Sequence, residues 1–281
     1  MLRAFPLASL LALSLLGEGC AFTLTDRNLL PQRKAPLPQS SALVSQEPVA
    51  LPVEGATLRG WLFKVPEARR TIVFFYGNGG SVVSSGGELA YLATALSADI
   101  VNLDYRGYGF SDGQATFAAL GADAIRAVDW ARQRWPDRPL FVAGYSLGTA
   151  MAIHAAAARP VAGLALVAPP SSIQDLAQAM KAEGPWYYAF VTVKVEPGIL
   201  ELPQPSEEIA VITAPLLIVH GTEDTQVPLW MGEKLLTRSP ARAKELCRVP
   251  GADHGTVFLS DPMRECFGRF FLGPARPPAP E

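Results

Sequence analysis

The chain is poor in the residues that bind metals and nucleic acids. It carries three histidines and three cysteines in 281 residues, and they are scattered rather than set at the paired spacing of metal ligands. Charged residues make up 18% of the chain, the formal net charge is −2, and there is no long run of one sign. These absences argue against a bound metal, against a nucleic-acid-binding surface and against a polybasic membrane patch.

The apolar run near the N-terminus is too short to span a bilayer comfortably. It covers Leu7 to Leu16, follows Arg3 and precedes Cys20, which is the layout of a secretory signal peptide over residues 1–20. Cys20 resembles the lipidated cysteine of a bacterial lipoprotein. We therefore expect an exported protein of the cell envelope that is tethered to the membrane through Cys20. A soluble periplasmic or secreted protein with an ordinary signal peptide is the alternative.

Proline-rich segments enclose the part of the chain that can form a core. Residues 21–42 combine Pro31, Pro36 and Pro38 with Gln, Ser and Arg, which predicts an extended linker. Residues 273–281 are predicted to be a disordered Pro-rich tail. Hydrophobic residues make up 49% of the whole chain, so a domain over residues 43–272 has ample material for a core.

Within this domain, patterns typical of strands and of helices alternate. Strands are expected at residues 43–53, 57–65, 71–76, 99–104, 140–144, 161–168, 215–220 and 244–249, and helices at 86–97, 115–134, after Ser146, at 229–237 and in a last segment ending near Leu272. This order predicts an α/β fold with a mostly parallel central sheet and helices on both faces. The loops at the carboxyl ends of the strands should gather along one edge.

The alternation stops over residues 169–214, which predicts a short cap inserted into the domain. Trp186, Tyr187 and Tyr188 lie in this insertion. They suggest an apolar acyl or aryl pocket for a substrate. Packing of the cap on the core is the alternative explanation for them.

Residues 139–157 carry a motif for nucleophilic chemistry. An apolar β-forming run leads into Gly144-Tyr145-Ser146-Leu147-Gly148, and Ala-rich helix-forming sequence follows. A strand that turns directly into a helix strains the residue at the turn, and flanking glycines relieve the crowding. The hydroxyl of Ser146 then stands at the N-terminus of the helix, where developing negative charge is favoured. Ser146 is therefore the predicted nucleophile.

A serine hydroxyl needs a base, and the base needs a group that orients it. His254 is the predicted base, because it follows the last expected strand. His154 should pack its helix, and His220 should frame the next turn. Asp224 is the preferred acid, since it follows the penultimate strand and precedes the base in the order that such sites require. Asp175, after an earlier strand, is the other candidate.

The oxyanion of an acyl-transfer intermediate needs fixed hydrogen-bond donors. The N–H of Leu147, at the helix start, is one predicted donor. The other is the N–H of Asn78, in the loop Tyr76-Gly77-Asn78-Gly79-Gly80 that follows a buried strand. A phosphate-binding loop is disfavoured here, because the Lys-Ser/Thr pair of a P-loop is missing.

Five motifs in order resemble those of the α/β-hydrolase superfamily, and within it those of small bacterial serine hydrolases of the serine aminopeptidase-like or esterase-like branch. They are Gly-Asn-Gly-Gly at 77–80, Asp-Tyr-Arg-Gly-Tyr-Gly at 104–109, Gly-x-Ser-x-Gly at 144–148, His-Gly-x-x-Asp-x-x-Val-Pro at 220–228 and Asp-His-Gly at 253–255. The resemblance covers residues 43–272 and implies the α/β-hydrolase fold, with Ser146, Asp224 and His254 as a catalytic triad.

Two residues in or beside these motifs are expected to hold loops: Tyr76 frames the loop of the expected oxyanion donor, and Arg106 belongs to a neighbouring loop. Tyr76 stands where this superfamily usually has a histidine before Gly77. Arg106, in the second motif, is expected to lock the neighbouring loop.

The resemblance and the predicted residues together imply acyl transfer to water without a cofactor. We predict a serine hydrolase that cleaves an ester, thioester or amide bond through an acyl-enzyme on Ser146. A carboxylesterase or lipase-like activity on a small-molecule or lipid-like acyl substrate is the first choice. A peptidase or acyl-transfer enzyme of the same mechanism is one alternative, because these reactions share this site on this fold. A non-catalytic binding protein that retains the fold is the other.

Two cysteines are expected to lie close together in the domain. Cys247 is on the last expected strand and Cys266 on the helix that should cover it. An exported protein could oxidise such a pair. Because buried free cysteines are common in cores, we expect two separate thiols.

Overall fold

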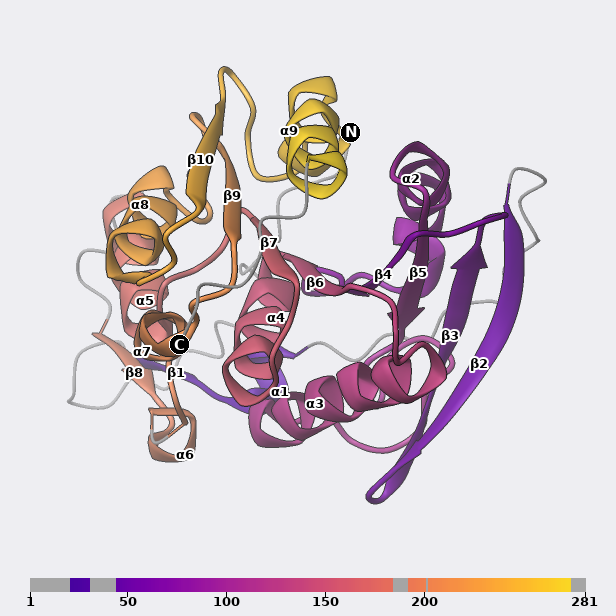
Figure 1. Cartoon of the computed structure of the whole chain (residues 1–281). Helices are drawn as coiled ribbons and strands as arrows, with labels where there is room; N and C mark the ends of the chain where they lie inside the picture. The colour runs from indigo at the N-terminus through magenta and orange to yellow at the C-terminus, as the bar shows by residue number, and fades with distance from the viewer. Residues whose placement is uncertain (1–20, 31–43, 184–191, 201, 274–281) are drawn as a thin grey trace.

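Eight strands form the central sheet of the structure, a computed structural model that describes residues 21–30, 44–183, 192–200 and 202–273 (Figure 1). The strand order is β10-β9-β7-β6-β4-β5-β3-β2. The bounds are β2 (Ser45–Val53), β3 (Ala56–Lys64), β4 (Arg70–Phe75), β5 (Ala98–Leu103), β6 (Leu140–Tyr145), β7 (Gly163–Val167), β9 (Leu216–Gly221) and β10 (Lys244–Val249). Neighbours from β10 to β5 pair in parallel, whereas β3 pairs antiparallel with both β5 and β2. The predicted mostly parallel sheet is confirmed.

Helices cover both faces of this sheet, as predicted (Figure 1). On one face lie α2 (Val82–Ala95) and α9 (Asp261–Leu272), which an ion pair between Glu88 and Arg264 joins at 2.6 Å. On the other lie α3 (Phe117–Arg134), α4 (Leu147–Ala158) and α8 (Leu229–Arg238). The helix expected at 86–97 begins earlier, at Val82, because the side chains of Ser81 and Ser84 bond reciprocally to each other's backbone N–H and cap the first turn.

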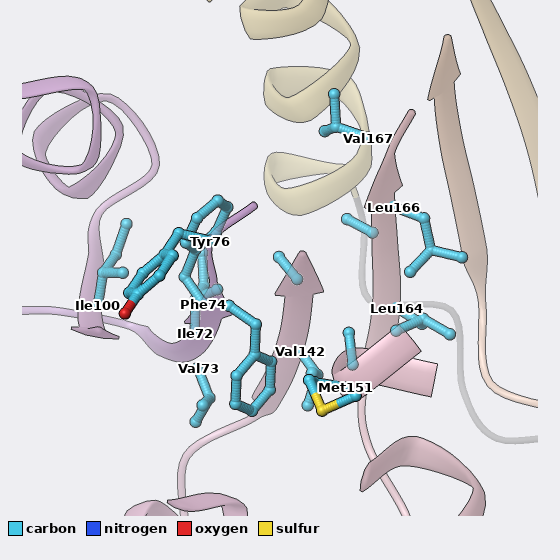
Figure 2. Packing of buried hydrophobic residues seen from close by; sticks show 14 of the residues in the cluster. Ile72, Val73, Phe74, Tyr76, Ile100, Val142, Met151, Leu164, Leu166 and Val167 are labelled. Atoms are coloured by element: carbon cyan, nitrogen blue, oxygen red, sulfur yellow. The ribbon is translucent and has the colours of Figure 1, made fainter. Parts of the chain in front are cut away.

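The inner strands are nearly continuous apolar runs because both of their faces are covered. Figure 2 shows Phe74 of β4, Val142 of β6 and Leu164 of β7 among the buried side chains, together with Met151 of α4. The edge strand β2 instead alternates exposed and buried residues over positions 48–52. The core therefore lies on both faces of the sheet, beneath the two helix layers. It fixes the strands, and with them the loops at their carboxyl ends, relative to one another.

The segment between β7 and β9 contributes no described strand to the central sheet. It contains α5 (Ile173–Glu183), β8 (Thr192–Val195), α6 (Pro197–Leu200), α7 (Pro205–Glu208) and the 3₁₀ helix η3 (Ile209–Val211). We call this segment the cap. Trp186, Tyr187 and Tyr188 lie outside the described residues.

The first part of the expected linker is folded against the domain, which corrects that prediction for residues 21–30. Strand β1 (Ala21–Leu24) pairs in parallel with β8, and the one-turn helix α1 (Asp26–Leu29) follows it. Leu24 and Leu30 are buried, so apolar contact offsets the lost freedom of the chain. The prolines that suggested a linker begin only at Pro31, and residues 31–43 lie outside the described residues.

The structure joins Cys247 of β10 and Cys266 of α9 in a disulfide, with Cα atoms 6.5 Å apart. The expectation of two separate thiols is therefore wrong. The strand and the helix that covers it bring the two Cα atoms within the range that a disulfide spans.

In the described ranges of the chain, no helix combines the length and the apolar character that a membrane crossing needs.

Replacing both cysteines, as Cys247→Ser with Cys266→Ser, should lower the free energy of unfolding by about 3 kcal/mol. The reason is that a bond across a separation of 19 residues restricts the unfolded chain. Urea denaturation checks this, with reduced wild type as the matched control. Equal midpoints for oxidised wild type, reduced wild type and the variant would contradict the bond.

Candidate active site

Ser146 occupies a strained turn between β6 and α4. Its φ is 53° and its ψ −122°, a conformation that residues with a side chain rarely adopt. A Cβ on Gly144 would collide with the Gly148 backbone, and a Cβ on Gly148 would collide with the Phe75 carbonyl. The two glycines of the motif therefore let three backbone segments meet here. The Ser146 N–H donates to the Val167 carbonyl at 2.9 Å, and this bond holds the turn on the sheet.

His254 lies in the loop after β10 and contacts Ser146. Its Nε2 is 2.9 Å from Ser146 Oγ, and its Nδ1 is 2.7 Å from Asp224 Oδ2. Tyr145 fixes the loop, because its hydroxyl donates to the His254 carbonyl at 2.6 Å and its ring stacks on the imidazole. Burial raises the pKa of Tyr145, so this hydroxyl stays a neutral donor.

Asp224 lies in the loop after β9, and its side chain is fully buried. Its Oδ1 accepts the N–H groups of Gln226 and Val227 at 3.0 and 2.8 Å, and its Oδ2 faces His254. Hydrogen bonds of this kind stabilise a buried carboxylate and fix its orientation. Parallel strands β9 and β10 are neighbours, which brings the two loops together. The structure therefore places the three residues predicted from the sequence in one hydrogen-bonded row.

The other two histidines lie apart from Ser146 in separate contacts. His220 is fully buried, its Nε2 donates to the Val227 carbonyl at 2.7 Å, and burial lowers its pKa, so it is neutral. It thus frames the turn that holds Asp224. His154 on α4 lies 2.5 Å from Glu208 of α7, which raises the pKa of His154. It joins a helix to the cap.

The alternative acid, Asp175, is occupied elsewhere. It lies on α5, where its Oδ2 accepts the Lys234 ammonium at 2.6 Å and also the hydroxyl of Ser171. The structure thus brings Asp224, and not Asp175, to His254.

The loop of residues 77–80 lies directly against Ser146. A Cβ on Gly77 would stand 3.2 Å from the Ser146 Cβ and 3.0 Å from the Tyr145 ring. Leu147 is the first residue of α4, so its N–H has no partner within the helix. Both segments with predicted oxyanion donors, Asn78 and Leu147, therefore adjoin the serine.

Sequence reasoning missed the group that anchors this loop, which is the buried carboxylate of Asp104. Its Oδ1 accepts the Tyr76 hydroxyl at 3.1 Å and the Val82 N–H at 2.8 Å, and its Oδ2 accepts the Phe110 N–H at 2.9 Å. The Tyr105 hydroxyl donates to the Tyr76 carbonyl at 2.7 Å. Two features of the sequence pointed to these residues. Asp104 is the first residue of the motif at 104–109, and Tyr76 stands where a histidine is usual before Gly77.

Arg106 holds its own loop to neighbouring segments of the chain. Its guanidinium forms a two-pronged ion pair with Asp123 of α3, at 2.6 and 2.7 Å, and also donates to the Glu54 carbonyl. Arg106 therefore ties its loop to α3 and to the β2–β3 turn. The loop beside Ser146 is held by Asp104 instead.

Comparison with other proteins identifies the family. A family model described as serine aminopeptidase, S33 matches residues 66–201, a range that includes Ser146 and ends before Asp224. An uncharacterized protein of Mycobacterium tuberculosis is 30% identical over 266 residues, covering 92% of this chain and 91% of its own length. The lysophosphatidylserine lipase ABHD12 of Macaca fascicularis is 28% identical over 230 residues, covering 73% of this chain and 56% of that protein.

Solved structures share the fold at lower identity. An esterase of Pyrococcus furiosus superposes with a TM-score of 0.69 at 17% identity, covering 87% of this chain and 97% of its own. A carboxylesterase from a metagenomic library superposes at 0.63 with 19% identity, covering 83% and 89%. The chain belongs to the α/β-hydrolase superfamily. Within it, the family model that matches part of the chain is described as serine aminopeptidase, S33.

The contact between His154 and Glu208 predicts a pH-dependent stability. Because Glu208 raises the pKa of His154 in the folded state, the ion pair stabilises the fold fully below the unfolded pKa. That contribution disappears as the pH rises through the folded pKa. His154→Gln should therefore lower the free energy of unfolding more at about pH 5.5 than at about pH 9. Urea denaturation at both pH values measures this. Glu208→Gln is the control background, in which the difference between the two pH values should disappear.

Proposed function

We propose that the protein is a serine hydrolase that cleaves a carboxylic ester through an acyl-enzyme on Ser146. The observation that carries the proposal is the row of hydrogen bonds from Asp224 through His254 to Ser146, at 2.7 and 2.9 Å. The order of serine, base and orienting acid is the one that nucleophilic acyl transfer requires.

The proposed mechanism follows from these positions. Ser146 Oγ attacks the substrate carbonyl carbon while His254 Nε2 accepts the serine proton, and Asp224 holds the imidazolium that forms. The N–H groups of Leu147 and Asn78 donate to the oxyanion. When the tetrahedral intermediate collapses, His254 gives its proton to the departing alcohol, and the acyl group remains on Ser146. Water, activated by the same histidine, then releases the acid.

The relatives favour an ester substrate over an amide. Both structural neighbours described above are named as esterases, and one group of sequence relatives is named as lysophosphatidylserine lipases. These names support a carboxylesterase or lipase-like activity on a small or lipid-like acyl ester. A peptidase or acyl-transfer enzyme would use the same three residues.

Labelling with a fluorophosphonate probe tests the nucleophile directly. Wild type should be labelled on Ser146 and should hydrolyse short p-nitrophenyl esters. Ser146→Ala should lose labelling and about 1000-fold or more of the turnover. Asp224→Asn should lose less than Ser146→Ala, because the base remains. Asp175→Asn is the matched control and should keep full turnover.

The alternatives give different results in these assays. A folded wild type that is neither labelled nor active would favour the binding protein. Labelling with turnover of peptide amides and not of esters would favour the peptidase. Loss of activity in Asp175→Asn with none in Asp224→Asn would contradict the assigned acid.

We also propose that the protein is exported and that Cys20 carries a lipid. The signal-like segment over residues 1–20 supports this, and the folded strand β1 adds a consequence. Because β1 starts at Ala21, a lipid on Cys20 would be held close beside the cap and not at the end of a long linker.

Membrane fractionation of the bacterial host tests the lipid. Wild type should sediment with membranes, because two or three acyl chains give an essentially permanent attachment. Cys20→Ser should move to the soluble fraction. A soluble wild type whose N-terminus lies beyond Ala21 would contradict lipidation and indicate an ordinary signal peptidase.

A further inference from the structure

Residues 21–30, which we call the strap, are fastened to three separate parts of the domain. Strand β1 pairs with the cap strand β8 along its full length, and the N–H of Glu196 donates to the Leu24 carbonyl at 2.8 Å. Asp26 accepts the N–H of Phe117, the first residue of α3, at 3.0 Å. The third attachment reaches the loop beside Ser146.

That attachment is a hydrogen bond from the Asn78 side chain to the strap. Leu29 ends the single turn of α1, so the helix provides no partner for its carbonyl. Asn78 Nδ2 donates to this carbonyl at 2.7 Å. At the other end of the carboxamide, Oδ1 accepts the hydroxyl of the fully buried Tyr108 at 3.3 Å. The carboxamide is therefore held from both sides.

Asn78 is the one residue in the loop Gly77-Asn78-Gly79-Gly80 with a side chain by which the loop can be held. Gly79 has a φ of +70°, and glycines leave a backbone with more freedom than any other residue. Fixing the Asn78 side chain restricts the peptide plane whose N–H is the proposed oxyanion donor. An oxyanion donor must already be in place when negative charge develops on the substrate oxygen. If the loop had to move at that stage, the movement would raise the activation barrier.

From these contacts we infer that the strap positions the Asn78 N–H through the Leu29 carbonyl and joins that donor to the cap through β8. The inference rests on the proposed function, in which this N–H stabilises the oxyanion. The Asn78 side chain is thus a positioning group, and the Leu29 carbonyl supports it from a segment that lies outside residues 66–201 matched by the family model.

Two full-length variants break the contact from opposite sides. Asn78→Ala removes the donor, and Leu24→Asp with Leu30→Asp places charges where the strap is buried. Each should lower kcat by about 10-fold, part of the ~100- to 1000-fold that loss of an oxyanion donor costs, and should change KM little. Combining them should lower kcat no further, because both remove the same bond. Arg27→Ala, at an exposed position of the strap, is the control and should keep full activity.

A boronic acid that binds as a tetrahedral adduct gives a second readout. Its affinity should fall in parallel with kcat/KM in the strap variant and in Asn78→Ala, since a positioned donor acts on the oxyanion more than on the substrate. Losses in kcat that multiply in the combined variant, or an unchanged kcat in Asn78→Ala, would overturn the inference.

Hydrogen exchange at residues 77–80 separates failure of this inference from failure of the proposed function. The backbone amides of this loop should exchange faster in the strap variant than in wild type and Arg27→Ala, whether or not the protein turns over an ester. An inactive wild type with faster exchange in the strap variant would overturn the hydrolase and keep the contact. An active wild type with unchanged exchange in the strap variant would overturn the strap alone.

Discussion

The close approach of three backbone segments at Ser146 is the constraint on which the rest of the site depends. The end of β4, the end of β6 and the start of α4 meet where Gly144 and Gly148 leave no room for a Cβ. The left-handed φ of Ser146 costs on the order of 1–3 kcal/mol, and the surrounding hydrogen bonds and core hold it in place. In this conformation the hydroxyl stands beside the first turn of α4 and within reach of His254 from another loop.

The parallel sheet supplies that base. Because β9 and β10 are adjacent and parallel, the loops that carry Asp224 and His254 emerge side by side at the same edge as the turn after β6. Burial of Asp224 would destabilise its charge if it were alone. Two backbone N–H groups and the imidazole offset that cost and also orient the carboxylate. Neutral His220 lies beside this acid, with its Nε2 3.8 Å from Asp224 Oδ2, and adds no positive charge that would compete with His254.

The loop opposite the base depends on contacts from two distant stretches of chain, the motif at residues 104–109 and the strap. Asp104 holds its flanks through Tyr76 and Val82, Tyr108 holds one end of the Asn78 carboxamide, and the strap holds the other. Because glycine has no side chain, a loop rich in glycine can approach the serine closely. The same lack of side chains leaves its backbone free to move, so the loop needs contacts from other segments to hold it. The strap also connects this loop to the cap. Its strand β1 pairs with β8 of the cap, and its Leu29 carbonyl accepts a hydrogen bond from Asn78, whose N–H is the proposed oxyanion donor.

The sequence by itself determined the elements whose physics is local. Apolar runs predicted the buried strands, the glycine spacing around Ser146 predicted the strained turn, and chain order predicted Asp224 and His254. Only the tertiary structure decided which distant groups meet: β1 with β8, Asn78 with Leu29, Asp104 with Tyr76, and Cys247 with Cys266. A hydrogen bond or a disulfide depends on distances of a few ångströms between segments far apart in the chain. Composition and periodicity describe one segment at a time, and they carry no information about those distances.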